Sequence, residues 1–167
     1  MSELLESIPL HRESVDVAVL LGLTVDIMQR QASASGVRLT VRVDDDVPSM
    51  VRLDREKVAW AVTSLVGSAL RHVQGPGAWV DVHASSQHGE LSICVRDNGP
   101  GITTGQLHKL WQRDQWQPGM GLALLMVRDI ATAHGGTLAV SSRTAALDHF
   151  TSVCFTIAHA DSAALRH

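Results

Sequence analysis

Apolar residues recur at helical spacing in three separate segments of the chain. In residues 16–35 the apolar positions fall three to four apart, and Gly36 follows as a stop signal. Residues 54–72 repeat this pattern, and so do residues 121–134, which end at Gly135-Gly136. The sequence therefore predicts three amphipathic helices, each with one face buried against the rest of the molecule.

Between these helices, apolar and polar residues alternate, which is typical of strands with one buried face. The alternation covers residues 37–43, 80–84, 91–95, 137–141 and 151–157. The second and third of these segments are close in sequence and predict an antiparallel hairpin. The order of helices and strands predicts an α/β fold, a two-layer sandwich with a mixed, mostly antiparallel sheet and helices on one face.

The same pattern sets the expected limits of the domain. Residues 15–160 are expected to form one compact domain, with residues 1–14 as a linker and residues 161–167 as a tail. Residues 103–118 have no sustained period, so we expect a mobile loop there. A chain of 167 residues with 45% hydrophobic content can bury a core of its own.

Charge and cysteine usage exclude several classes of function. The formal net charge is −3 and basic residues are scattered, so we expect no nucleic-acid partner. The sequence has no apolar run of the roughly 20 residues that span a bilayer and no signal peptide, so we expect a cytoplasmic domain without membrane contact. Cys94 and Cys154 are far apart in sequence, and we expect both to be free thiols.

Two glycine-rich segments carry candidate chemistry. The first, Asp97-Asn98-Gly99-Pro100-Gly101-Ile102, follows a predicted strand and combines a carboxylate with backbone that can approach a flat ligand. The second, residues 119–124, opens a predicted helix, where unpaired N–H groups favour a phosphate. Taken singly, the first is equally explained as an ordinary turn and the second as a loop-to-helix junction.

The joint arrangement of these segments is more specific. A helix with polar residues at Ser64, Ser68, Arg71 and His72 comes first, then DNGPGI, then GMGLALLMVRDIATAHGG. In this order they resemble the GHKL ATPase superfamily, and within it the catalytic domain of bacterial sensor histidine kinases. The resemblance covers residues 15–157 and implies the Bergerat-type ATP-binding fold with ATP as the cofactor.

The resemblance implies a role for each residue of the first motif. Asp97 corresponds to the carboxylate that accepts a hydrogen bond from the adenine amino group. Gly99 and Gly101 correspond to the glycines that keep the base pocket open, and Ile102 to the aliphatic residue that follows them. Adenine specificity is expected to depend on Asp97.

The resemblance also implies which residues lie near the phosphates of the nucleotide. The backbone N–H groups of Gly119, Gly121 and Leu122 correspond to those that line the triphosphate, and residues 103–118 to the lid over the nucleotide. Arg71 and His72 correspond to a basic residue that reaches phosphate and to a residue near the nucleotide; His72 is also explained as a half-buried residue at a helix end.

One helix departs from the family pattern. The family has asparagines in a motif like N-L-x-x-N-A, of which the second coordinates Mg²⁺, whereas this chain has Ser64 and Ser68 at the two positions. A serine hydroxyl is shorter than an asparagine carbonyl, so Ser68 is a poor magnesium ligand. Ser64 also lacks the carboxylate with which ATP-hydrolysing relatives activate water, so simple ATP hydrolysis is not expected.

The resemblance leaves several functions open. The leading one is transfer of the γ-phosphoryl group of ATP to a histidine on a separate dimerisation and phosphoacceptor domain, with a response regulator downstream. None of the nine histidines has the H-E-x-x-x-P setting of a phosphoacceptor, and the domain alone is expected to be monomeric. A second is a degenerate regulatory module that binds Mg-ATP weakly or not at all, and a third, ranked last, is an anti-sigma serine kinase.

Overall fold

The computed structural model describes residues 8–73, 75–110 and 120–159. Seven strands and four helices are assigned within these residues. In chain order they are β1 (Glu13–Val15), α1 (Val17–Ala34), β2 (Arg38–Val43), β3 (Val51–Leu53), α2 (Arg55–His72), β4 (Trp79–Gln87), β5 (Glu90–Asp97), α3 (Thr104–Leu110), α4 (Met120–Ala133), β6 (Leu138–Ala145) and β7 (Asp148–Ala158).

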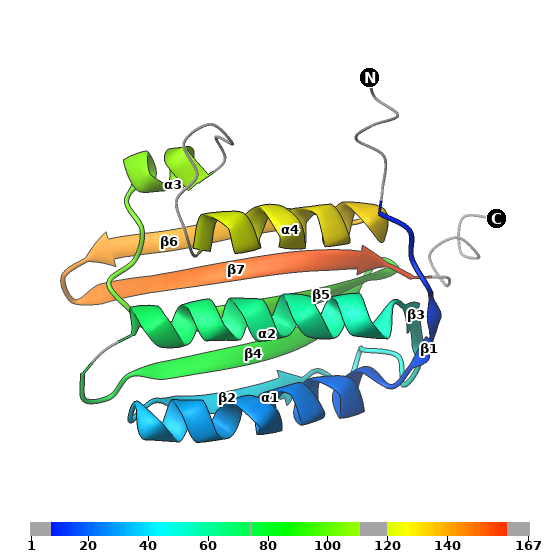
Figure 1. The fold of residues 1–167 in the computed structure, drawn as a ribbon, viewed down its shortest axis with the longest axis horizontal. Helices are drawn as coiled ribbons and strands as arrows, with labels where there is room; N and C mark the ends of the chain where they lie inside the picture. The colour runs from blue at the N-terminus through cyan, green and yellow to red at the C-terminus, as the bar shows by residue number, and fades with distance from the viewer. Residues whose placement is uncertain (1–7, 74, 111–119, 160–167) are drawn as a thin grey trace.

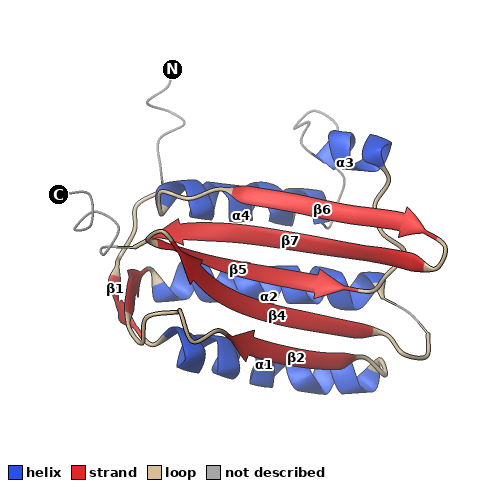
Figure 2. Ribbon diagram, turned by 180° about the vertical axis from the view of Figure 1, so that it is seen from behind, coloured by secondary structure: helices blue, strands red, loops and turns tan. Residues whose placement is uncertain are grey.

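Five strands form one sheet in the order β2-β4-β5-β7-β6. The β2–β4 pair is parallel and the other three pairs are antiparallel. Helices α1, α2 and α4 lie side by side over one face of this sheet (Figure 1), and none of the described helices covers the opposite, open face (Figure 2). The predicted two-layer α/β sandwich with a mostly antiparallel sheet is confirmed.

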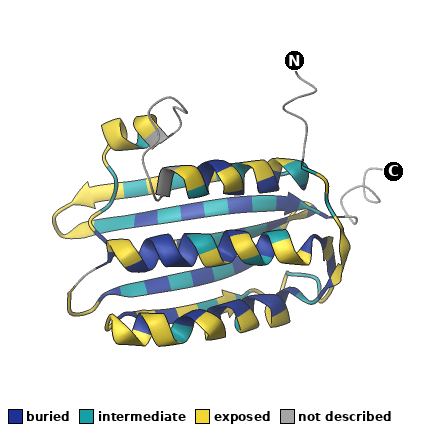
Figure 3. Ribbon diagram, in the orientation of Figure 1, coloured by how far each residue is buried: buried dark blue, intermediate teal, exposed yellow. Residues whose placement is uncertain are grey.

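The core lies between the helices and the sheet. Along β4, β5 and β7 the residues alternate between buried and partly exposed, so each strand turns every second side chain toward the helices (Figure 3). Leu21, Leu91, Ile93 and Phe155 are completely buried there. Each such side chain contributes roughly 1.5–3 kcal/mol relative to leaving it exposed to water, so this interface holds the two layers together.

A small two-stranded sheet of β1 and β3 closes one end of the domain. Both strands are too short to give a sequence signal, and Glu13 and Ser14 belong to the segment expected to be a linker. This end also contains buried Asp54, the N-cap of α2, whose carboxylate accepts hydrogen bonds from the N–H groups of Lys57 and His11. The N-terminal segment is thereby attached to the start of α2.

The expectation of an irregular loop from residue 103 onward is wrong for its first part, because α3 forms there. The N–H of Thr103 donates to Oε1 of Gln106 at 2.9 Å, and the N–H of Gln106 donates to Oγ1 of Thr103 at 3.2 Å. This reciprocal pair is a capping box, a local signal that the sequence carries. Residues 111–118, the rest of the expected lid, lie outside the described residues.

The expectation of free thiols is also wrong, because Cys94 and Cys154 are joined by a disulfide bond. The two residues are 60 positions apart, but they are direct partners in the register of β5 and β7. Sequence separation therefore gave no measure of their distance in the fold. Within the described part of the chain, no helix has the length and apolar character needed to cross a membrane.

His134, at the C-terminal end of α4, is completely buried and has a structural role. Its Nδ1–H donates to the carbonyl of Ile130 at 2.8 Å, and its Nε2 accepts from the backbone N–H of Asp54 at 3.0 Å. This arrangement requires the neutral imidazole. Burial lowers the pKa of His134, and the hydrogen bond to Ile130 and the charge of Asp54 offset only part of that effect. The ring thus links the end of α4 to the start of α2.

We predict that this link weakens in acid. The folded-state pKa of His134 lies below its unfolded value near 6.5, so its contribution is complete above that pH and is lost as the pH falls. His134→Phe fills the site but leaves the Asp54 N–H unpaired, which costs about 1–3 kcal/mol at pH 7.5. Thermal unfolding from pH 5 to 8 should show a smaller acid loss for this variant than for wild type.

The matched control is His11→Gln, which removes an exposed imidazole from the same end of the domain. It should keep the wild-type dependence of unfolding temperature on pH. An identical pH dependence in His134→Phe and wild type would show that His134 does not control acid stability.

Candidate functional site: a nucleotide pocket

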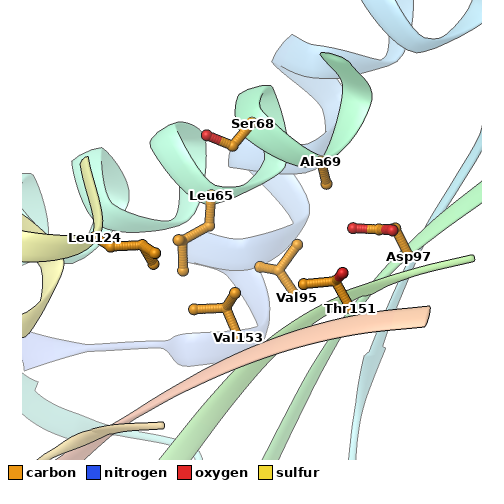
Figure 4. Close-up of a pocket in the computed structure, with 8 residues that line it drawn as sticks. All are labelled: Leu65, Ser68, Ala69, Val95, Asp97, Leu124, Thr151 and Val153. Atoms are coloured by element: carbon orange, nitrogen blue, oxygen red, sulfur yellow. The ribbon is translucent and has the colours of Figure 1, made fainter. Parts of the chain in front are cut away.

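A pocket lies between the helical layer and the sheet. α2 and α4 form one side, and β5 and β7 form its floor (Figure 4). The residues that line it are mainly aliphatic, with three polar side chains among them: Leu65, Ser68, Ala69, Val95, Asp97, Leu124, Thr151 and Val153. Of the predicted site residues, the structure brings Asp97 and Ser68 together in this pocket.

Asp97 is the last residue of β5 and is only 4% exposed. Its Oδ1 accepts the backbone N–H of Gly99 at 2.8 Å. Burial raises the pKa of Asp97, and the Gly99 N–H and the nearby His72 counteract only part of this rise. In Figure 4 the carboxylate points from the sheet toward Ala69 of α2. The pocket thus holds one hydrogen-bond acceptor that is expensive to bury and is aimed into an otherwise apolar space.

The glycine-rich turn after Asp97 is attached to the β6–β7 hairpin. The N–H of Ile102 donates to Oγ of Ser142 at 2.7 Å, and this hydroxyl donates to the carbonyl of Phe150 at 2.8 Å. His149 donates its Nδ1–H to the carbonyl of Gly99 at 2.6 Å. Sequence reasoning missed Ser142 and His149, because only the folded hairpin places them beside the turn.

Thr151 was missed for a related reason. It is the partner of Asp97 in the β5–β7 register, and its hydroxyl group lies at the same end of the pocket (Figure 4). At the other side of the turn, Asn98 accepts the N–H of Trp79 and donates to the carbonyl of Gly77. The turn is therefore fixed to β4 on one side and to the hairpin on the other.

The structure explains why this turn contains glycines. Gly101 has a φ of +83°, and a Cβ there would collide with the carbonyl of Arg143 in β6. A Cβ on Gly99 would lie 2.8 Å from Oδ1 of Asp97 and 3.2 Å from the carbonyl of His72. Gly99 leaves room for the carboxylate of Asp97, and Gly101 lets the turn approach β6. The need for both glycines comes from the protein itself, before any ligand is considered.

The polar face of α2 was predicted to reach the nucleotide. Ser68 is buried, and its hydroxyl accepts a hydrogen bond from Nη2 of Arg71 at 3.3 Å. His72 turns back on its own helix, with its Nδ1–H donating to the Ser68 carbonyl at 2.8 Å. Ser64, one helical turn before Ser68, is not among the residues that line the pocket. Arg71 is thus the cation placed next to the Ser68 hydroxyl.

The predicted phosphate segment lies at the start of α4. This helix begins at Met120, so Gly121 and Leu122 are in its first turn, where backbone N–H groups have no partner within the helix. The Leu122 side chain is 43% exposed, whereas Leu124 is buried and faces the pocket. Gly119 lies outside the described residues, so its expected role stays a prediction.

The donor set does not fit a directly bound magnesium ion. Mg²⁺ prefers carboxylate or carbonyl oxygens, and Ser68 offers a hydroxyl that already accepts from a guanidinium group. The positive charge of Arg71 beside this hydroxyl further disfavours a second cation. Among the described residues, no three His, Cys, Asp or Glu side chains gather as a metal site.

An aliphatic pocket with one buried carboxylate, next to a glycine-rich turn and a helix N-terminus, has the features of a small-ligand site in an α/β sandwich. Residues 53–161 match the family model described as histidine kinase-, DNA gyrase B-, and HSP90-like ATPase. The chain belongs to this family, and the relatives it resembles are bacterial sensor histidine kinases.

Two curated relatives show the extent of the similarity. The chain is 28% identical over 148 residues to the sensor histidine kinase ZraS of Escherichia coli K12, a match that covers 86% of this chain and 31% of ZraS. It is 34% identical over 137 residues to the sensor protein DivL of Caulobacter vibrioides, covering 80% of this chain and 17% of DivL. The chain thus spans a third or less of each of these relatives.

Solved structures share the fold. The mycobacterial sensor histidine kinase MprB superposes with a TM-score of 0.73 at 26% identity, covering 89% of this chain and 98% of that one. Full-length ShkA in complex with AMPPNP superposes with a TM-score of 0.79 at 21% identity, covering 92% of this chain and 32% of ShkA.

We predict that Gly101→Ala destabilises the domain. The new methyl group meets the Arg143 carbonyl, and the left-handed backbone adds strain, for a total of about 1–3 kcal/mol. The melting temperature should fall by roughly 2–10 °C in a scanning calorimeter or by circular dichroism.

Gly22→Ala is the matched control, since a Cβ at this α1 position meets nothing within 4 Å. It should leave stability unchanged or raise it by up to about 1 kcal/mol. A Gly101→Ala protein as stable as wild type would show that the turn does not need to lie so close to β6.

Proposed function

We propose that this chain is the ATP-binding catalytic domain of a sensor histidine kinase, and that the pocket between α2 and β5/β7 takes the adenine base. The single observation that carries this proposal is Asp97, a buried acceptor at the edge of an aliphatic pocket. The Gly99 N–H satisfies only part of the hydrogen-bonding capacity of this carboxylate, so a donor on a ligand would offset more of the cost of its burial.

The chemistry of the pocket favours adenine over guanine. Leu65, Val95 and Val153 offer aliphatic surface to both faces of a flat ring. The exocyclic amino group of adenine is a donor and suits the Asp97 carboxylate, whereas guanine has a carbonyl acceptor at the corresponding position. Two acceptors facing each other repel, so guanine nucleotides should bind much more weakly.

The phosphates would extend from this pocket toward the start of α4. The N–H groups of the first turn, including those of Gly121 and Leu122, have no partner within the helix and give this helix end a partial positive charge. Arg71, beside Ser68, supplies a full positive charge from α2. Positioning and charge neutralisation of this kind are the main contributions of proteins to phosphoryl transfer.

The acceptor in our proposal is a histidine on a separate dimerisation domain, and a response regulator receives the phosphoryl group afterwards. A histidine nucleophile needs no carboxylate to activate water, which agrees with serine at position 64. The solved complex of histidine kinase ThkA with the response regulator TrrA contains a neighbour of this fold and supports the partner class. We place the domain in the cytoplasm and expect it to be monomeric on its own.

Magnesium has no part in this proposal beyond water-mediated contact, because Ser68 is a poor ligand. The same substitution supports a second candidate, a regulatory module that recognises a partner without turning over ATP. The regulatory module would bind nucleotide weakly or not at all, whereas the catalytic domain must bind ATP and turn it over.

We predict that Asp97→Asn weakens ATP binding without lowering stability. The loss of a charged acceptor should reduce affinity by about 1.5–3 kcal/mol, roughly 10- to 100-fold, in calorimetric titrations. Burial raises the pKa of Asp97 in the folded state. Ionisation of this carboxyl group therefore lowers the free energy of unfolding as the pH rises through the range in which carboxyl groups titrate. The variant has no such cost and should melt no lower than wild type at pH 7.5.

Asp81→Asn is the matched control, because Asp81 pairs with Arg42 on the open face of the sheet, away from the pocket. It removes the same charge and should leave ATP affinity unchanged. Equal ATP affinity in Asp97→Asn and wild type would exclude adenine recognition by Asp97, and absence of ATP binding to wild type would favour the regulatory module.

We also predict that Ser68→Asn creates a dependence on magnesium. Wild-type ATP affinity should be nearly the same with MgCl₂ and with EDTA, because the hydroxyl at position 68 is occupied by Arg71. The amide oxygen of the introduced asparagine reaches farther than this hydroxyl and should tighten binding several-fold in MgCl₂ only. Strong magnesium dependence in wild type, or none in the variant, would contradict this account of the metal site.

A further inference from the structure

We propose that Cys94 and Cys154 form a thiol–disulfide exchange site on the open face of the sheet, and that its redox state controls the order of the pocket floor. The disulfide joins β5 to β7 at directly paired positions. Both cysteines are half-buried and alternate along β5 and β7 with buried residues that face the helices, so they lie on the open face of the sheet, where a reductant can reach them.

The surroundings of the two sulfur atoms are those of a reactive pair. Ser92 and Ser152, each two residues before a cysteine, place their Oγ atoms 3.7 Å and 3.6 Å from the sulfur atoms of Cys94 and Cys154. A hydroxyl donor at this distance stabilises a thiolate. Each strand thus carries the same Ser-x-Cys unit, with the hydroxyl and the sulfur on one face.

Two further polar side chains lie on the same face near the disulfide. His83 of β4, which is hydrogen-bonded to Asp44, is the register partner of Cys94 on the side away from β7. Arg96 follows two residues after Cys94 on the same face, with its guanidinium 4.3 Å from the ring centroid of Phe150. Cations near a cysteine favour the thiolate, which is both the attacking and the leaving form in disulfide exchange.

The exchange reaction needs an external dithiol of protein or small-molecule origin. Its thiolate attacks the sulfur of one cysteine, the S–S bond breaks, and the other cysteine leaves as a thiolate that takes up a proton. The second thiol of the reductant then attacks the mixed disulfide and releases the first cysteine. Two electrons pass to the protein, which ends with two thiols, while the reductant ends as a disulfide.

In the β5–β7 register, the disulfide-bonded pair lies directly next to a pair of residues that line the pocket. Val95 pairs with Val153 next to it, and both side chains line the pocket on the opposite face of the sheet. The pair Asp97–Thr151 follows two residues later at the pocket edge. A cross-link at Cys94–Cys154 therefore holds together the two strands that form the floor and position the adenine acceptor.

Oxidation should order this floor and favour ligand binding. A covalent bond between the strands suppresses local opening of β5 from β7, and a pre-organised pocket loses less freedom when a ligand binds. Cytoplasmic disulfides are mostly transient and redox-sensing, so the proposed location agrees with a reversible bond. The effect on nucleotide binding rests on the proposed function, whereas the exchange site itself does not.

The test uses the whole 167-residue chain, equilibrated in buffers of varied ratio of oxidised to reduced dithiothreitol. Maleimide trapping and intact-mass analysis count the free thiols at each ratio. We expect a two-electron transition with both thiols appearing together. Hydrogen exchange should show stronger protection of amides 93–97 and 151–155 in the oxidised form, and the melting temperature should rise by on the order of 10 °C. ATP affinity should be about fivefold higher in the oxidised form.

Variants separate the disulfide from other effects of the buffer. Cys94→Ser and Cys154→Ser, singly and together, should fold and show none of these redox differences. The matched control Arg38→Cys adds an exposed thiol to β2, two strands away from β5 on the same sheet face, and should keep the wild-type transition. Redox differences that persist in the double serine variant would overturn the proposal.

Two further outcomes would also overturn the proposal. One is free thiols at every ratio of oxidised to reduced dithiothreitol, and the other is equal hydrogen-exchange protection of β5 and β7 in both redox forms. If neither redox form binds ATP, the proposed function fails, but redox-dependent strand protection would still support the exchange site.

Discussion

The antiparallel pairing of β5 with β7 is the constraint on which the pocket depends. The register sets Val95 beside Val153 as the floor and Asp97 beside Thr151 at the edge. On the opposite face the same register aligns the two cysteines. A slip of one residue would turn the aliphatic floor to solvent and the cysteines into the core, so fold and site are specified by one set of backbone hydrogen bonds.

The buried carboxylate that allows the pocket to recognise a ligand donor lowers the stability of the folded domain. A carboxylate buried among aliphatic side chains is less stable than in water, as the raised pKa of Asp97 shows. The backbone N–H of Gly99 offsets part of this, and it does so because the turn is fixed to the hairpin through Ser142 and His149. The remaining cost is what a ligand donor can relieve.

Local sequence signals predicted the three long helices and the main strands, whereas the expectation that Asp97 and Ser68 belong to one site came from the resemblance to a family. The capping box of Thr103 and Gln106 was an equally local signal for α3, which a search for S/T-x-x-E/Q would have found. By contrast, the Cys94–Cys154 pair and the contacts of Ser142 and His149 depend on which strands become neighbours. Period and composition carry no information on that pairing, so these features could not be read from the sequence.

Serine at position 68 changes how the pocket can handle charge. Triphosphate needs positive charge, and a protein supplies it by a metal ion, a cationic side chain or a helix N-terminus. Ser68 accepts a hydrogen bond from Arg71, so a guanidinium group lies beside this hydroxyl, at the position where the family motif has an asparagine. A guanidinium is fixed in the protein and does not depend on the concentration of free metal. On the proposed function, the charge of the phosphates would then be met by Arg71 and the start of α4, with binding set by the protein alone.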